Sequence, residues 1–314
     1  MNILVAGGAG FIGSQIVDAF LANNDRVIVV DGLLPETGGS PANLPDNPNL
    51  EVHFSRVEDL AVLSDLVLQS DLVVDAMGWT RHLLALERPS YDLSLNVSSH
   101  LGLIAAFPPE GGPRVIYLGS RGQYGNPSVA VIDESIPCVP QDIQGVHKQA
   151  GESHWRIASK LRHFPVASLR FGNTFGPRQP TIGRDIGLVG QFIRDLSNGN
   201  EIELFGEGRI RPLIYAPDVA RAIIKIAPKP WEGFQSFNVS GWDVPLEALV
   251  GRLCKIMGHG SWRVAPFPEH VRMIDVGNAA FDGSYFDEQF GGFERSNFEM
   301  ALCNTLKTLT PFQQ

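Results

Sequence analysis

The sequence has few cysteines and no closely spaced set of metal-ligating side chains. Its three cysteines, Cys138, Cys254 and Cys303, are odd in number and lie far apart among 314 residues. They therefore predict neither a disulfide framework nor a zinc site. Widely spaced free thiols are typical of a reducing compartment, so we expect a cytoplasmic protein without a bound metal.

The sequence also lacks any basic run and any long hydrophobic run. Its formal net charge is −9 and its isoelectric point is about 5.4, which argues against nucleic acid or an anionic membrane surface as the main partner. No segment approaches the ~18 uninterrupted apolar residues of a membrane-spanning helix. The first six residues already have an apolar strand pattern, with no charged leader before them. We therefore expect neither nucleic acid nor a membrane as a partner.

What the sequence does contain is an alternation of short apolar runs with helical patterns. The runs are nearly continuous, as in parallel strands that are covered on both faces. This alternation predicts an α/β fold with a Rossmann-type, doubly wound parallel sheet. The expected strands cover residues 3–6, 27–31, 50–54, 72–76, 115–119 and 166–171, and the expected helices cover residues 14–23, 60–69, 91–106 and 144–159.

After about residue 173 the rhythm changes, because glycine, proline and arginine become common and the elements become shorter. Residues 214–226 and 236–240 still have the pattern of a helix and a strand that return to the main sheet. We therefore predict a dinucleotide-binding domain from residues 1–173 together with 212–241. Residues 174–211 and 242–314 are predicted to form a smaller C-terminal substrate-binding region over the carboxyl ends of the strands, where ligands bind in such sheets.

A glycine-rich segment follows the first expected strand and opens the first expected helix. Gly7, Gly10 and Gly13 permit a tight turn and a close approach of the backbone to a pyrophosphate, and Phe11 and Ile12 lie between them. The free N–H groups and the positive dipole end of the helix would face that anion. In this position, between a strand and a helix, the pattern predicts a dinucleotide cofactor.

The second expected strand ends in an acidic residue that selects among dinucleotides. Asp31 lies 18 positions after Gly13, where its carboxylate can accept hydrogen bonds from a ribose diol. It would repel a 2′-phosphate, and the segment from Gly32 to residue 36 has no Arg or Lys to bind one. The cofactor is therefore predicted to be NAD rather than NADP. Arg56, after the third expected strand, either stacks on the adenine or is a surface arginine.

Longer motifs resemble those of the extended short-chain dehydrogenase/reductases, in particular the NAD-dependent epimerase/dehydratase family that acts on nucleotide sugars. Residues 170–178 read Arg-Phe-Gly-Asn-Thr-Phe-Gly-Pro-Arg and residues 204–208 read Leu-Phe-Gly-Glu-Gly, both similar to segments of that family. The resemblance implies a nucleotide-diphosphate sugar as substrate, with arginines suited to its phosphates. The residues expected near the diphosphate are Asn173, Arg211 and Arg272, of which Arg272 is equally consistent with a surface charge.

The same family carries Tyr-x-x-x-Lys on its catalytic helix, and this sequence departs from that pattern at one position. Lys148 is present, but Gln144 stands where the tyrosine is expected. In the family reaction, tyrosinate takes the proton of a sugar hydroxyl while hydride passes from the carbinol carbon, usually carbon 4, to NAD. By the same resemblance, Ser120 holds that hydroxyl and Lys148 binds the nicotinamide ribose. An amide does not ionise near neutral pH, so Gln144 cannot be a general base.

Three explanations of the missing tyrosine stay open. A substitute base could act, and the candidates are His147, Lys148 itself and a water relay through Ser120. Alternatively, the chemistry could be restricted to a slow oxidation or an altered dehydration. Finally, the protein could be a non-catalytic pseudoenzyme that binds NAD and a nucleotide sugar.

Three further expectations concern dehydration, the sugar pocket and the oligomeric state. The 4,6-dehydratases place Asp-Glu after their Ser or Thr, and here those positions are Arg121 and Gly122, which counts against dehydration in its standard form. Thr80 and its neighbours after the fourth expected strand either line the sugar pocket or pack in an ordinary loop. Family members often dimerise through the helices expected here at 91–106 and 144–159, which implies a homodimer with an apolar face of Leu93, Leu95, Leu101 and Leu103.

Overall fold

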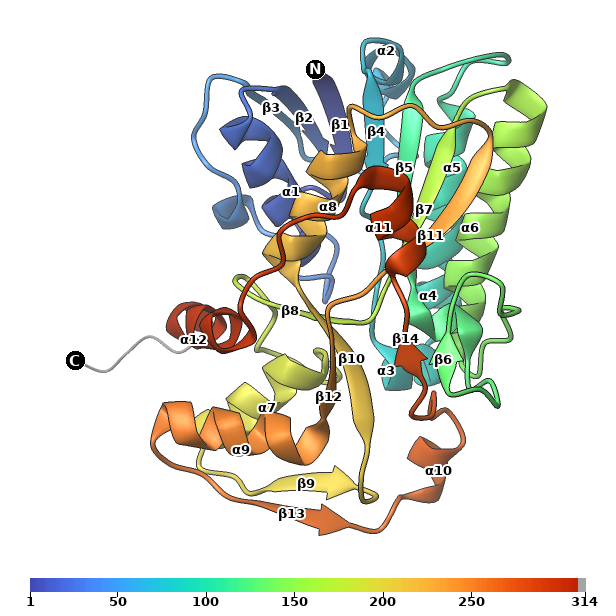
Figure 1. The fold of residues 1–314 in the computed structure, drawn as a ribbon. Coiled ribbons are helices and arrows are strands. Elements are labelled where there is room, and N and C mark those ends of the chain that lie inside the picture. The colour runs from blue at the N-terminus through green and yellow to red at the C-terminus, as the bar shows by residue number, and fades with distance from the viewer. Residues whose placement is uncertain (310–314) are drawn as a thin grey trace.

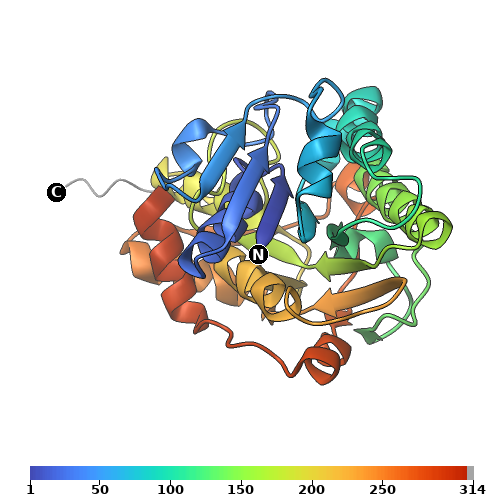
Figure 2. The same ribbon diagram turned by 90° about the horizontal axis from the view of Figure 1, so that it is seen from above.

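The computed structural model describes residues 1–309, and its centre is a seven-stranded sheet (Figures 1 and 2). All neighbouring strands in it run parallel. Chain order along the sheet reverses between β1 and β4, which is the arrangement of a doubly wound fold. The strands in order across the sheet are β11 (Phe234–Val239), β7 (Val166–Phe171), β5 (Arg114–Ser120), β4 (Leu72–Asp75), β1 (Asn2–Ala6), β2 (Arg26–Val30) and β3 (Leu50–His53). The predicted fold class is therefore confirmed.

Helices cover both faces of this sheet, and successive residues of the strands serve opposite faces. In β1, Ile3 and Val5 belong to one buried cluster and Leu4 and Ala6 belong to the other. Both side-chain sets are fully buried, which is why the strands read as continuous apolar runs. The first layer consists of α1 (Phe11–Ala22), α8 (Ala216–Ile226) and α11 (Ser284–Phe290), and the second of α2 (Leu63–Leu68), α5 (Ser99–Ala105) and α6 (Ile143–Arg162).

The expected helix at residues 91–106 is divided into three consecutive pieces. These are α4 (Pro89–Leu93), a π-helical turn η2 (Ser94–Ser98) and α5. Asn96, inside the π turn, accepts the N–H of Trp79 at 3.0 Å and donates to its carbonyl at 2.8 Å. The irregular turn therefore fixes the loop that follows β4, as π turns at functional sites often do.

A second group of elements lies below the carboxyl ends of the strands in Figure 1. It has its own buried cluster, which includes Phe175, Leu213 and Leu249. The segment 214–226 is partly as predicted: α8 covers the main sheet, but β10, which precedes it, pairs with β8 and β12 instead. The division into two functional parts stays a prediction. The group comprises β8 (Asn173–Phe175), α7 (Leu188–Ser197), β9 (Ile202–Phe205), β10 (Ile210–Tyr215), β12 (Trp242–Pro245), α9 (Leu246–Met257), β13 (Trp262–Ala265) and α12 (Phe298–Leu309).

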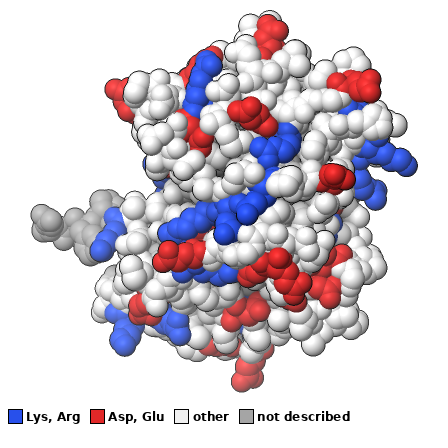
Figure 3. All heavy atoms as spheres, turned by 45° about the horizontal axis from the view of Figure 1, so that its top comes forward, with Lys and Arg blue, Asp and Glu red and all other residues white. Residues whose placement is uncertain are grey.

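The long loop after β2 is tied to the glycine-rich turn. The backbone N–H of Ser40 and the side-chain amide of Asn43, in the short helix η1 (Pro41–Asn43), both donate to the carbonyl of Ala9, at 3.1 and 2.8 Å. Ordered contacts thus place this loop beside the first helix. Within residues 1–309, no helix is long and apolar enough to cross a bilayer. On the face drawn in Figure 3, a short band of Lys and Arg is flanked by carboxylates.

Candidate active site

A cavity of about 1000 Å³ lies between the carboxyl ends of the main strands and the second group of elements. Both parts of the fold contribute to its lining, for example Gly7 after β1 and Phe205 at the end of β9. This volume is at the upper end of the range, roughly 300–1,000 Å³, of pockets that enclose one drug-sized ligand. The cavity therefore has space for an extended dinucleotide and part of a second ligand.

The glycine turn forms one end of the cavity, and its shape excludes side chains. Gly7 has φ +80°, and a Cβ on it would lie 2.9 Å from the carbonyl carbon and oxygen of Ala76. A Cβ on Gly13 would lie 2.1 Å from the carbonyl oxygen of Gly7. Gly10, the residue before α1, offers no side-chain cap, so the first N–H groups of the helix are left for a ligand. Gly10, Phe11 and Ile12 line the cavity beside them, and this cradle fits a pyrophosphate.

Asp31 lies beside the turn and is 8% exposed. One carboxylate oxygen accepts the N–H of Ala9 at 2.9 Å, and the other accepts the N–H of Leu33 at 2.8 Å. Burial raises the pKa of Asp31, while these two backbone donors oppose the shift. Each oxygen keeps a lone pair for a ribose hydroxyl. Gly32 and Arg56 also line the cavity, and Arg56 pairs with Glu58 at 3.0 Å.

Ser120 ends β5 and begins the short helix η3 (Arg121–Tyr124). Its Oγ accepts the N–H of Gly122 at 3.0 Å, and its own N–H donates to Oε1 of Gln123 at 2.8 Å. Gln123 is held in turn by Glu152, which accepts its side-chain amide at 2.9 Å. The Ser120 hydroxyl is thus held at the cavity wall by a buried network, with its proton available to a ligand.

Lys148 and Gln144 lie one turn apart on α6, and both line the cavity. Nζ of Lys148 donates to the carbonyls of Leu118 at 3.1 Å and Met77 at 3.2 Å. Burial lowers the pKa of Lys148 to about 8, although the carboxylates of Asp75 and Asp92 oppose this. Nζ thus has one N–H without a partner among the described residues, which suits a ribose hydroxyl.

The amide of Gln144 is an unsatisfied polar group. The residue is 1% exposed, and its Oε1 is buried without a hydrogen-bond partner in the part of the chain that the structure describes. Such an acceptor costs about 1–3 kcal/mol when nothing donates to it. A ligand hydroxyl in the cavity would supply the missing donor.

No tyrosine takes the place of Gln144, because none of the five in the sequence lines the cavity. The hydroxyl of Tyr124 donates to Asn238 at 2.8 Å, and burial raises its pKa to about 12. Tyr117 donates to the carbonyl of Lys148 at 2.9 Å from a fully buried position. Neither tyrosine can take a proton from a ligand here.

Two residues expected in the site lie outside the cavity lining. His147 follows Gln144 on α6 but points to α4, where its Nδ1 contacts Asp92 at 2.5 Å. His147 is adjacent to Lys148 on α6, and adjacent positions on a helix face directions about 100° apart, so the two side chains point to different sides. Arg272, at the end of α10 (Glu269–Arg272), is exposed and pairs with Glu269 at 2.6 Å.

The expected diphosphate residues Asn173 and Arg211 do line the cavity, and so does Thr80. Arg211 donates to Oδ1 of Asp275 at 2.7 Å, and Arg209 pairs with the same carboxylate. Arg209 and Arg211 therefore share one carboxylate, but of the two only Arg211 lines the cavity.

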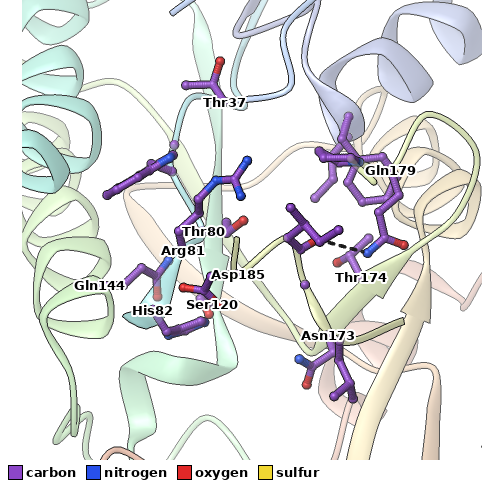
Figure 4. Close-up of a pocket in the computed structure, with 18 of the residues that line it drawn as sticks. Thr37, Thr80, Arg81, His82, Ser120, Gln144, Asn173, Thr174, Gln179 and Asp185 are labelled. Carbon is purple, nitrogen blue, oxygen red and sulfur yellow. Dashed lines mark hydrogen bonds between the residues drawn. The ribbon is translucent and has the colours of Figure 1, made fainter. Parts of the chain in front are cut away.

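The sequence left open whether His82, in the loop after the fourth expected strand, lines the sugar pocket, and it gave no role to Asp142; the structure brings these two residues together. His82 begins α3 (His82–Glu87) and lines the cavity, and its Nδ1 contacts the carboxylate of Asp142, the residue before α6. Sixty positions separate them, so no local pattern could indicate the pair. Figure 4 shows His82, Ser120 and Gln144 on one side of the cavity and Asn173, Thr174 and Gln179 on the other.

Arg81, beside His82, joins two loops that border the cavity. Its Nε donates to the carbonyl of Glu36 at 2.9 Å, and another guanidinium nitrogen donates to the carbonyl of Arg184. Its side chain is almost completely buried. Among the side chains that the structure describes, no cluster of three or more His, Cys, Asp or Glu is suited to a metal ion.

A glycine turn after β1, an acidic residue after β2 and a lysine-bearing helix beside β5 thus meet at the carboxyl ends of parallel strands. They define a dinucleotide-binding protein of the Rossmann type. The model of the NAD dependent epimerase/dehydratase family matches residues 3–240, and the chain belongs to this family.

Individual relatives extend this match over most of the chain. A UDP-glucose 4-epimerase of Mycolicibacterium smegmatis is 29% identical over 246 residues, which cover 76% of this chain and 77% of that protein. A dTDP-glucose 4,6-dehydratase of Streptomyces antibioticus is 23% identical over 314 residues, which cover 98% of this chain and 91% of that protein. The crystal structure of a UDP-glucose 4-epimerase of Thermotoga maritima with UDP-glucose has a TM-score of 0.83 and 27% identity, and the match covers 98% of each chain.

Proposed function

We propose that this protein is an NAD-dependent oxidoreductase that oxidises a hydroxyl of a nucleotide-diphosphate sugar, at carbon 4. One observation carries the proposal: the glycine turn, the Ser120–Gln144–Lys148 cluster and the Arg211 region line one continuous cavity. NAD, when bound, supplies the acceptor for the hydride that leaves the sugar carbon. The keto sugar would then be epimerised, dehydrated or released.

Each residue of the cluster has a role that its contacts support. The Ser120 hydroxyl is free to donate to or accept from a sugar hydroxyl, since its other bond is to the Gly122 N–H. The unpartnered Oε1 of Gln144 accepts a hydrogen bond from a neighbouring hydroxyl of the sugar and removes no proton. Lys148 holds the nicotinamide ribose.

Oxidation followed by epimerisation fits the site better than dehydration. Arg121 stands where dehydratases have an acid, and its guanidinium is held by hydrogen bonds to the carbonyls of Gly125 at 2.9 Å and Val276 at 2.7 Å. Gly122 provides no side chain to move a second proton. The site therefore offers no standard acid for the loss of water.

The test is the near-ultraviolet absorbance of NADH when protein and NAD are mixed with UDP-, GDP- and dTDP-sugars. Sugar-dependent NADH formation by the natural protein supports the proposal. The competing function is a non-catalytic binder of NAD and a nucleotide sugar, which the un-ionisable Gln144 favours. It would be accepted if no sugar gives NADH while Gln144→Tyr restores the signal.

Asp31→Asn is expected to reduce the preference for NAD over NADP by about tenfold, because an amide no longer repels a 2′-phosphate and binds the ribose diol less strongly. The measurement is the dissociation constant of each cofactor by calorimetry. Asp46→Asn, at an exposed position outside the cavity, is the matched control. An unchanged ratio in Asp31→Asn would show that Asp31 does not contact the ribose.

We further propose a homodimer through α4–α5 and α6, with a smaller apolar contribution than expected. Leu93 and Leu101 are 43% and 44% exposed and are available to a second copy. Leu95 and Leu103 were also expected in this interface, but both are buried in the protein's own core. They are therefore not available to a second copy. Exposed Ile157 and Leu161 on α6 provide further apolar surface.

A further inference from the structure

His82 has one ring nitrogen held by the protein and one that is free. Its Nδ1 contacts the Asp142 carboxylate, whereas Nε2 makes no hydrogen bond with any side chain or backbone group that the structure describes. The side chain is 39% exposed in the wall of the cavity. A histidine fixed by a carboxylate at Nδ1 presents Nε2 to a ligand, as in many sites that transfer protons.

The free edge of this ring shares one space with the cluster that binds the hydroxyl. A Cβ on Gly122 would lie 3.3 Å from Ser120 Oγ, 3.8 Å from Gln144 Oε1 and 3.9 Å from His82 Cε1. The three groups therefore lie within 4 Å of one point beside Gly122, and all of them line the cavity. A ligand hydroxyl in the adjoining part of the cavity is thus within reach of this group of side chains.

Asp142 connects this histidine to the helix that carries Gln144 and Lys148. One carboxylate oxygen contacts His82, and the other accepts the N–H of Gly145 at 2.7 Å as the N-cap of α6. Asp142 is 8% exposed, so its position is fixed by both contacts. The same residue thus sets the start of α6 and the orientation of the imidazole.

We propose that His82 is the catalytic residue that exchanges the hydroxyl proton in place of the missing tyrosine, with Asp142 as its positioning residue. The inference rests on the proposed function. In the oxidation, the O–H proton moves to Nε2 of neutral His82, and the C–H hydride with its two electrons moves to NAD⁺. The products are the sugar ketone, NADH and an imidazolium, which returns its proton to oxygen when the ketone is reduced.

The charged groups around His82 determine the pH at which it works. Burial lowers its pKa, but the hydrogen bond and charge of Asp142 on α6, with Asp185 in the facing loop and Asp92 on α4, outweigh this and raise the pKa to about 9. Asp185 is close, since its carboxylate accepts the N–H of Leu83 at 2.7 Å. Lys148, the other titratable group of the cluster, is positive below its pKa of about 8. Oxidation needs neutral His82, so its rate rises as pH approaches 9, and reduction of the ketone falls above that pH.

The first experiment measures single-turnover NADH formation across pH. His82→Gln is expected to lower the rate about 10²–10⁴-fold with unchanged NAD affinity, as for the loss of one general base. Asp142→Asn keeps an N-cap but removes the charge, so the midpoint of the pH profile is expected to move down toward the ordinary histidine value. His53→Gln, which removes a histidine paired with Glu51 outside the cavity, is the matched control and leaves the rate unchanged.

The second experiment needs no turnover. Nuclear magnetic resonance of the eight histidines in the protein without ligands is expected to show one that titrates near pH 9, absent in His82→Gln and shifted to lower pH in Asp142→Asn. If the pH at which the His82 resonance titrates is the same in Asp142→Asn as in the natural protein, the proposed pairing of His82 with Asp142 is wrong.

The outcomes separate the two proposals. Full NADH formation by His82→Gln, or a loss seen only in His147→Gln, overturns the role of His82 and leaves the proposed function intact. Absence of NADH from the natural protein, with recovery in Gln144→Tyr, defeats the proposed function and with it the proton transfer at His82.

Discussion

Replacing Gly13 by alanine is expected to weaken NAD binding by about 100-fold, the factor that ~3 kcal/mol of overpacking produces. The added Cβ would lie 2.1 Å from the carbonyl oxygen of Gly7 and 2.9 Å from Cα of Gly8. Both neighbours are backbone atoms, so no side chain can rotate away, and the turn itself has to open. The N–H groups at the start of α1 then lose their common direction. Calorimetric titration with NAD measures the effect.

The control is the same substitution in a helix where space is open. A Cβ on Gly251, in α9, meets no atom within 4 Å. Gly251→Ala is therefore expected to leave NAD binding unchanged and to stabilise the fold by up to ~1 kcal/mol, the helix preference for alanine. An NAD affinity of Gly13→Ala equal to that of Gly251→Ala would contradict the close approach at this turn.

Arg170→Met is expected to destabilise the protein by about 3–5 kcal/mol, because it leaves a buried carboxylate without its counterion. Arg170 donates to Glu152 at 2.5 and 2.9 Å, and the side chains are 7% and 9% exposed. Urea unfolding measures the change. Arg26→Met is the matched control: its pair with Glu51 is exposed on the surface and is worth only about 0–1 kcal/mol.

The Arg170–Glu152 pair also predicts how the stability difference between the natural protein and Arg170→Met depends on pH. Burial raises the pKa of Glu152, but Arg170, Ser168 and Gln123 outweigh it and hold the pKa below the ordinary value. A depressed carboxyl pKa contributes stability above the unfolded value of about 4.3, and that contribution is lost as pH falls through the folded value. The stability gap between the natural protein and Arg170→Met should therefore shrink as pH falls below about 4. Glu152→Gln combined with Arg170→Met should recover part of the loss, and no recovery would argue against an unpaired charge as the cause.

The sequence predicted the parts of this fold that depend on local patterns. Strand β7 has the expected bounds, 166–171, because continuous burial on both faces leaves a continuous apolar run. The expected helix at 60–69 proved shorter, at Leu63–Leu68, and the π turn at Ser94–Ser98 was not foreseen. Helix ends and irregular turns depend on tertiary contacts such as those of Asn96 with Trp79, which no local periodicity records.

The candidate site also contains residues that local sequence patterns predict and residues that they do not. Residues in the glycine turn or at helical spacing, such as Gly13, Gln144 and Lys148, line the cavity because adjacent positions fix their directions. His82 and Asp142 could not be paired in advance, since strands, helices and sixty residues separate them. For His147, proximity in sequence was misleading: its side chain contacts Asp92.

The guanidinium of Arg81 connects two loops that border the cavity. It holds the carbonyl of Glu36 in the loop after β2 and that of Arg184 in the loop before α7, so two segments about 150 residues apart are fastened across the same opening. Both loops contribute residues to the cavity lining, so a ligand that displaces either loop must stretch or break a hydrogen bond to Arg81. Through this one side chain, a movement of one loop is transmitted to the other.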